Sequence, residues 1–207
     1  MKSHTPIKTH FSREDWDIGT DHWFIDTAHY ISPPTSIRYV GAFSDSSHQL
    51  CRYQPAICLP EGQLIYYTRT DHPVQHASPV FRATAPLGVA SRANSYSIVQ
   101  DATRGHVDFR EMADGSIVRA WQHSAPTYST HTWYHWRCTW FLQNGNLIVH
   151  LDRWDGTAWQ PHCAPFTVTD PIHGDSPIQR CGLRTWAHDD IGIWIDDTEI
   201  LTVPGPE

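Results

Sequence analysis

Pairs of acidic side chains are the residues of this 207-residue chain whose spacing could support catalysis. Hydrolysis of a glycoside with retention of configuration needs two carboxyl groups about 5–5.5 Å apart. On a β-strand this corresponds to alternate positions, because successive side chains point to opposite faces. The nearest pairs are Asp197 with Glu199, Asp15 with Asp17, and the opposite-parity Asp108 and Glu111. Solvated carboxylates at a strand end are the favoured interpretation, so we predict no catalytic residue and no enzyme.

The same acidic residues could instead bind a hard cation. Asp196 or Asp197, joined to an early-loop carboxylate such as Asp15 or Asp17, would supply the oxygen ligands that Ca²⁺ prefers. The alternative is that the Asp196–Asp197 pair ends a strand and accepts hydrogen bonds from backbone N–H groups. A structural Ca²⁺ is the only cofactor that the sequence suggests.

The 15 histidines and five cysteines form no recognisable metal or nucleophile motif. His131 and His135 are four residues apart, which on a strand separates them by roughly 13 Å. The odd number of cysteines and the absence of a Cys-x-x-Cys pair argue against a zinc ribbon or a disulfide framework. Cys51 and Cys58 could form a local bridge, but reduced thiols are favoured. No Gly-x-Ser-x-Gly sequence marks a serine nucleophile.

The elements that must position these residues centre on the stretch from His131 to Pro161. It holds three strand-like runs separated by Asn144-Gly145 and Asp155-Gly156, dipeptides that suit tight hairpin turns. The sequence therefore predicts a three-stranded antiparallel meander. In its first run one parity is apolar and should be buried: Tyr134, Trp136, Cys138, Trp140 and Leu142. The other parity gives a mixed face.

The rest of the chain repeats this pattern. About a dozen short runs rich in β-branched and aromatic residues alternate with turn signals, and no helical period is present. We predict an all-β fold, a two-sheet antiparallel β-sandwich or jelly roll, as a single domain over residues 1–207. In the closing run from Ile191 to Leu201 the apolar parity is interrupted at Asp196-Asp197, which predicts a β-bulge.

Segments spread over nearly the whole chain carry a family resemblance. They are SPPTSIR, LPEGQLIYYTR, VFR, the central meander, GLRTW and WIDDTEI. In this order they resemble the concanavalin A-like lectin/glucanase superfamily, particularly laminin G-like modules of extracellular and phage structural proteins. The resemblance implies a jelly roll of two curved sheets, whose concave face binds glycans in many relatives and is structural in others. The Glu-x-Asp-x-x-Glu pattern of its β-glucan hydrolases is absent here.

Sugar binding would need exposed aromatic rings that stack on pyranose faces, beside polar groups that bond hydroxyls. The candidates are Trp133, Trp154 and Trp159, with Arg137, Asp152 and Arg153 as polar neighbours. Most of the ten tryptophans should lie in the core. Core or rim packing is accordingly the alternative for each of the three candidates.

The composition of the chain limits the kinds of molecule that it can bind. The net charge of −7 and the scattered arginines argue against nucleic acid, and neither a membrane span nor a signal peptide is evident. We expect a non-catalytic recognition or structural module, a phage virion component such as a capsid decoration or tail-associated protein with glycan affinity. A stand-alone carbohydrate-binding protein and a polysaccharide hydrolase or lyase are the alternatives. The expected location is a virion or extracellular, and the expected partners are glycans, virion proteins or a second copy.

Overall fold

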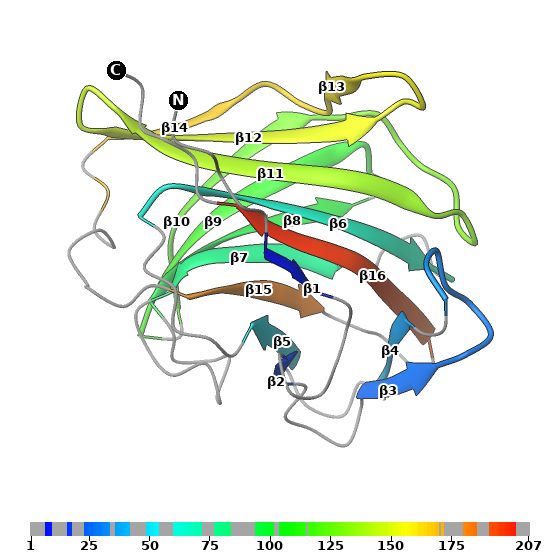
Figure 1. Ribbon diagram of the computed structural model, residues 1–207. Helices are drawn as coiled ribbons and strands as arrows, with labels where there is room; N and C mark the ends of the chain where they lie inside the picture. Colours follow the sequence, from blue (N-terminus) through cyan, green and yellow to red (C-terminus); the bar gives the residue numbers. More distant parts are fainter. Residues whose placement is uncertain are drawn as a thin grey trace.

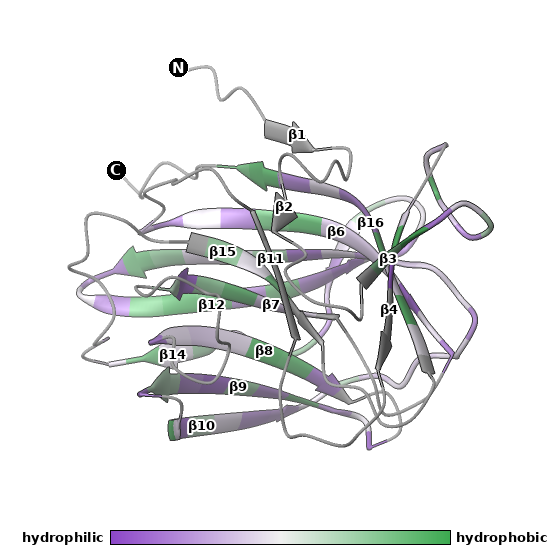
Figure 2. Cartoon of the chain, turned by 90° about the horizontal axis from the view of Figure 1, so that it is seen from below, coloured by the Kyte–Doolittle hydropathy of each residue, from purple (hydrophilic) through white to green (hydrophobic). Residues whose placement is uncertain are grey.

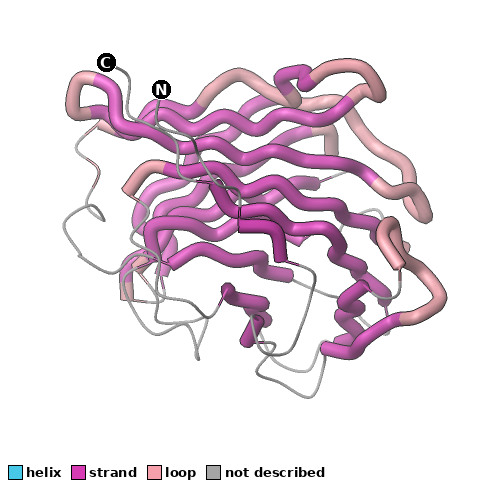
Figure 3. The backbone as a smooth tube through the Cα atoms, in the orientation of Figure 1, coloured by secondary structure: helices cyan, strands magenta, loops and turns pink. Residues whose placement is uncertain are grey.

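The structure, a computed structural model, describes most of the chain as strands joined by short loops (Figure 3). The described residues are 7–9, 16–17, 23–33, 36–41, 49–53, 60–71, 77–83, 94–101, 104–114, 116–169, 171, 180–185 and 191–201. They contain 16 strands and no helix, and therefore no helix that could cross a membrane. The predicted all-β fold class is confirmed.

Nine strands form one sheet, in the order β13-β12-β11-β6-β16-β4-β3, with β1 paired to β16 and β14 paired to β12 (Figure 1). Their bounds are β1 Ile7–Thr9, β3 Trp23–Asp26, β4 Ser36–Gly41, β6 Gly62–Thr70, β11 Tyr134–Gln143, β12 Asn146–Trp154, β13 Trp159–Pro161, β14 Phe166–Val168 and β16 Ile191–Leu201.

Seven strands form the second sheet, in the order β10-β9-β8-β7-β15-β5-β2. Their bounds are β2 Trp16–Asp17, β5 Gln49–Tyr53, β7 Ala77–Ala83, β8 Ser95–Asp101, β9 His106–Ala113, β10 Ser116–Ser124 and β15 Arg180–Thr185. Hydrophobic segments occur on strands of both sheets, among them β12 and β8 (Figure 2). The molecule is thus the two-sheet antiparallel sandwich that the sequence predicts.

The core lies between the two sheets and is rich in aromatic rings. Trp136, Cys138 and Trp140 of β11 are fully buried, which confirms the predicted apolar face of that strand. Phe81 of β7 stacks on Trp140 with ring centres 4.7 Å apart, so the two sheets meet through aromatic contacts. Gly62 is needed beside Trp140, because a Cβ there would lie 2.7 Å from the indole ring.

The central meander is confirmed, with one difference at its second turn. Asn144 and Gly145 have φ values of 53° and 79° and close a two-residue hairpin between β11 and β12. The turn at Asp155-Gly156 is longer than predicted: β12 ends at Trp154 and β13 begins at Trp159. The side chain of Asp155 accepts hydrogen bonds within this loop, and these extend the turn beyond two residues.

The bulge predicted near the end of the chain is also confirmed. The pairing of β16 with β6 shifts register between Asp196 and Glu199, and Asp197 has a φ of 40°. The shift returns Ile200 to the buried side that Ile193 and Ile195 occupy. The described residues contain 16 strands, more than the dozen or so runs that the sequence predicts. The proposed Cys51–Cys58 bridge lies outside the described side chains, while Cys138, Cys163 and Cys181 are free and buried.

Candidate functional site

A row of aromatic rings crosses the nine-stranded sheet on the face that points away from the core. Four adjacent strands contribute to it: Tyr67 from β6, His135 from β11, Trp154 from β12 and Trp159 from β13. Strand pairing sets Tyr67 opposite His135 and Trp154 opposite Trp159. We call these four residues the aromatic row.

The rings of the aromatic row contact one another in sequence. Tyr67 and His135 stack with ring centres 3.9 Å apart and planes 9° from parallel. His135 packs against Trp159 at 4.7 Å, and Trp159 meets Trp154 edge-on at 5.4 Å. Trp154 is the outermost member, with 37% of its surface exposed. The row therefore ends in an accessible indole supported by packed neighbours.

An arginine–carboxylate pair lies beside the aromatic row. Arg137 donates from Nε and Nη2 to the same oxygen of Asp152, at 2.9 and 2.6 Å, and the two residues are cross-strand partners. The guanidinium of Arg137 lies 4.8 Å from the ring centre of Trp159. The structure thus brings together four of the six residues predicted for sugar binding.

The other two predicted residues lie apart from this group. Arg153 pairs with Trp136 across the sheet, and its guanidinium lies 5.7 Å from the ring centre of Tyr134 rather than beside Trp159. Trp133 precedes β11 and makes no ring contact with any described residue. Sequence spacing does not single out Tyr67 and His135, because their contact depends on the pairing of β6 with β11.

The loop between β12 and β13 holds the two tryptophans in place. The Asp155 carboxylate accepts hydrogen bonds from the backbone N–H groups of Ala158 and Thr157, both at 2.8 Å. Further bonds come from the Thr157 hydroxyl and the Gln160 amide. All of these donors favour the ionised form and hold the pKa of Asp155 well below its usual range. A carboxylate capped in this way stiffens the hairpin.

The aromatic row carries little charge at neutral pH. Burial, followed by the nearby carboxylates of Asp197, Asp196 and Glu199, raises the pKa of the Tyr67 hydroxyl. Burial lowers the pKa of His135, although Glu199 and Asp197 oppose that shift. Tyr67 therefore keeps its O–H donor, and the imidazole of His135 is favoured in its neutral form.

Asp196 and Asp197, the predicted calcium ligands, bind a loop instead. Asp196 Oδ2 accepts the backbone N–H groups of Ile31 and Ser32 at 2.6 and 3.2 Å, and its Oδ1 accepts that of Asp197. The Ser32 hydroxyl donates to Asp197 Oδ2 at 2.5 Å. Three of the four carboxylate oxygens thereby accept hydrogen bonds, as in the alternative in which the pair ends a strand and satisfies backbone donors.

The proposed partners of this aspartate pair do not complete a calcium site in the described residues. Asp15 lies outside them, and Asp17 belongs to β2 of the other sheet, with its side chain not described. No group of three His, Cys, Asp or Glu side chains within the described ranges could hold a metal ion.

The carboxylate pair in β9 does not form a hydrolytic site. Glu111 is fully buried and accepts hydrogen bonds from the Tyr96 hydroxyl and from Arg119. Asp108 lies on the opposite face of β9, where it pairs with Arg110. The two carboxyl groups therefore cannot flank one glycosidic bond.

Comparison with known proteins places the fold. A scan of protein-family models gave no match, and neither did a search of curated proteins. Among solved structures, the chain is similar to winged bean acidic lectin complexed with methyl-α-D-galactose, at 10% identity over 96% of this chain and 98% of the lectin, with a TM-score of 0.57. It is also similar to lectin I of Ulex europaeus in complex with the methyl glycoside of α-L-fucose, at 8% identity over 96% and 97%, with a TM-score of 0.57.

A third similar structure is the exoplasmic/lumenal domain of VIP36 in its Ca²⁺/Man3GlcNAc-bound form. The identity is 12% over 96% of this chain and 92% of that domain, with a TM-score of 0.56. At these identities the likeness concerns the fold alone. The fold is the concanavalin A-like jelly roll, as the resemblance in the sequence implied.

Proposed function

We propose that this protein is a non-catalytic carbohydrate-binding protein, and that its glycan binds across the aromatic row of Tyr67, His135, Trp154 and Trp159. The observation that carries the proposal is the run of contacting rings from four adjacent strands, which ends in the exposed Trp154. Exposed aromatic rings on a rigid sheet suit the apolar face of a pyranose. The lectin fold supports this class of function.

The neighbouring pair supplies polar contacts. Arg137 has five N–H donors, of which two are used on Asp152. The others can bond sugar hydroxyls, and the Tyr67 hydroxyl adds a donor at the opposite end of the row. Because Asp152 and Trp159 both hold the Arg137 guanidinium, little conformational entropy is lost when a ligand binds.

The second sheet offers a weaker surface for sugars. Asp108 accepts hydrogen bonds from Arg110 and Gln122, both at 2.9 Å, on the outer face of β9 and β10. The His106 imidazole, whose Nε2 lies 3.6 Å from Asp108 Oδ1, is a smaller stacking surface than the indole rings of the aromatic row. We therefore place the ligand on the nine-stranded sheet.

The test is binding to an immobilised glycan library, followed by calorimetric titration with the strongest ligand. We expect Trp154→Ala and Trp159→Ala each to weaken binding at least tenfold, which corresponds to about 1.4 kcal/mol. Trp133→Ala is the matched control and should stay within about twofold of the wild type. Equal affinity in all four proteins, or loss only in Trp133→Ala, would place the ligand elsewhere.

Repeating the titration in the presence of a chelator tests whether the predicted Ca²⁺ supports glycan binding. Some neighbours of this fold are described as Ca²⁺-bound forms, but here the Asp196 and Asp197 oxygens accept N–H and O–H donors. We expect glycan affinity to be the same before and after chelation. A loss that added Ca²⁺ restores would show that a bound ion supports glycan binding.

Assembly into a virion is the second candidate function. The observation in its favour is the exposed apolar pair Ile117 and Val118, at 51% and 48% exposure, on the edge strand β10. Exposed apolar side chains on a sheet edge invite pairing with another chain. Light scattering after size-exclusion chromatography tests self-association. A monomer whose mass does not change with concentration would argue against a homo-oligomer, and a virion or extracellular location stays a prediction.

A further inference from the structure

Trp194 of β16 stands between two arginines on the outer face of the nine-stranded sheet. Strand pairing sets Arg38 on one side of it and Arg69 on the other. Their guanidinium carbons lie 5.0 and 5.1 Å from the centre of the indole ring. Gly192 leaves room for that ring, since a Cβ there would approach it to 2.4 Å. Stacking on one buried ring holds both guanidinium groups in place.

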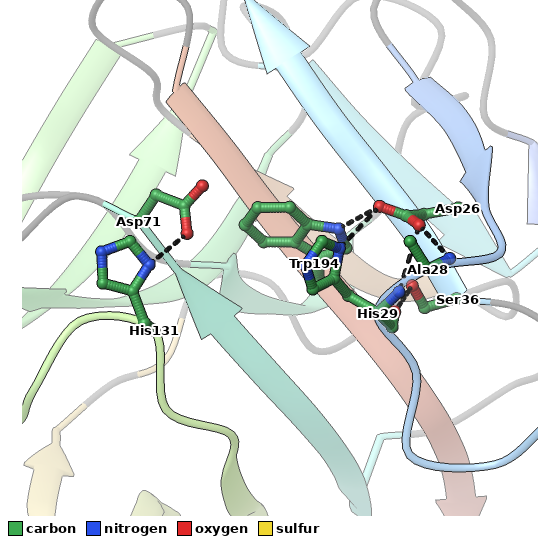
Figure 4. Close-up of polar contacts among 7 residues, drawn as sticks. All are labelled: Asp26, Ala28, His29, Ser36, Asp71, His131 and Trp194. Atoms are coloured by element: carbon green, nitrogen blue, oxygen red, sulfur yellow. Dashed lines mark hydrogen bonds and ion pairs between the residues drawn. The ribbon is translucent and has the colours of Figure 1, made fainter.

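The carboxylates around these arginines are engaged by other groups. Asp26 accepts the indole N–H of Trp194 at 2.5 Å and the backbone N–H groups of Ala28 and His29 (Figure 4). Asp71 pairs with His131 at 2.8 Å. Within the described ranges no carboxylate forms an ion pair with Arg38 or Arg69, and the Nε atom of each is buried without a hydrogen-bond partner. Two guanidinium groups therefore flank one indole ring, whose N–H is bonded to the carboxylate of Asp26.

A cavity of about 300 Å³ opens beside Arg38 at the end of the sheet formed by β3 and β4. Its lining includes Arg38, His29, Asp26 and the ring of Phe24, which is 49% exposed. Its volume is at the lower end of the range for ligand sites, which are apolar clefts with a few convergent polar groups. Arg38 supplies a cationic group and Phe24 an apolar wall. The Nδ1 atom of His29 lies 3.4 Å from Asp26 Oδ2, so its Nε2 atom is the one offered to a ligand.

We propose that this cavity is an oxyanion site, in which Arg38, assisted by His29, binds the carboxylate or sulfate group of an acidic saccharide. Guanidinium groups match planar carboxylates and sulfate oxygens through paired N–H donors. The Phe24 ring faces the remainder of the sugar. The saccharide part of this assignment rests on the proposed function, whereas the oxyanion part does not depend on the aromatic row.

The test follows the Arg38 Nε–H and Trp194 indole N–H signals by ¹H–¹⁵N NMR during titration with glucuronate, glucose and sodium sulfate. We expect glucuronate to shift both signals at about 10 mM, while glucose has no effect. Arg38→Gln should abolish the response of the Trp194 signal, and His29→Ala, in an exposed loop, should weaken it at least threefold. Arg110→Gln on the other sheet is the matched control and should respond as the wild type does.

The outcomes separate this site from the aromatic row. A glucuronate response that persists in Trp154→Ala supports an independent oxyanion site, even if no neutral glycan binds anywhere. Shifts with sulfate and none with glucuronate would overturn the saccharide assignment and leave a site for small inorganic anions. The absence of shifts with every probe, or shifts unchanged in both Arg38→Gln and His29→Ala, would overturn the oxyanion site itself.

Discussion

Among the described residues, His162 is a buried group whose ionisation should affect stability. Its side chain is 4% exposed, it packs edge-on against Trp136 at 4.9 Å, and its Nδ1 atom has no hydrogen-bond partner among the described residues. Burial, with a smaller contribution from Arg153, lowers its pKa from 6.5 to about 4. Folding therefore favours the neutral imidazole.

The lowered pKa of His162 predicts the pH range over which the free energy of unfolding should fall. Since the folded pKa lies below the unfolded value, the stabilisation is complete above pH 6.5 and is lost as the pH falls to about 4. We expect the free energy of unfolding to drop by about 2–3 kcal/mol across that window. Urea denaturation at several pH values measures it, and His162→Phe should remove most of the slope. The same slope in wild type and variant would contradict this role for His162.

The ionisation of Asp26 should affect the stability of the fold at lower pH than that of His162. Burial would raise its pKa, but hydrogen bonds from Trp194, Ala28 and His29 together lower it to about 2. Its contribution is therefore present above pH 3.8 and is lost between about 3.8 and 2. Asp26→Asn should therefore be less stable than the wild type in urea denaturation above about pH 4, and the difference should shrink as the pH falls from about 3.8 to 2. A difference that stays constant over that range would contradict this role for Asp26.

At the scale of elements, the bulge in β16 fastens the loop of residues 27–33 to the sheet. Asp196→Ala removes the acceptor of the Ile31 and Ser32 N–H groups. We expect a loss of about 1–3 kcal/mol in unfolding free energy, and amide exchange at these two positions should be at least tenfold faster. The Leu142 amide, bonded to Glu61 at 2.7 Å, is the internal control. Unchanged exchange at Ile31 and Ser32 would show that the carboxylate does not hold the loop.

Local patterns explain why some of these elements could be predicted from sequence. The alternation in β11 sets which residues are buried, Asn144-Gly145 sets the hairpin register, and the parity change at Asp196-Asp197 requires a bulge. Contacts between strands that are distant in the sequence produce no such local pattern. The hydrogen bond from Trp194 to Asp26 spans 168 positions, and the stack of Tyr67 on His135 depends on how β6 pairs with β11. Sequence spacing alone indicates neither.

For the molecule as a whole, part of the candidate site can be predicted from the sequence and part of it cannot. Trp154, Trp159, Arg137 and Asp152 belong to one continuous meander, so sequence reasoning could group them. Tyr67 and the Arg38–Trp194–Arg69 arrangement require the complete sheet order, in which β6, β16 and β4 lie side by side. The proposed site on the outer face thus depends on the assembly of the nine-stranded sheet.

Locating a bound ligand is the decisive test of glycan binding on the aromatic row. The measurement is ¹H–¹⁵N mapping of the tryptophan indole N–H signals during titration with the strongest ligand of the glycan library. We predict that the Trp154 and Trp159 signals shift and saturate together, whereas those of the fully buried Trp136 and Trp140 stay in place. Shifts confined to tryptophans outside the aromatic row, such as Trp121 on the other sheet, or no shift with any glycan, would contradict binding on the aromatic row.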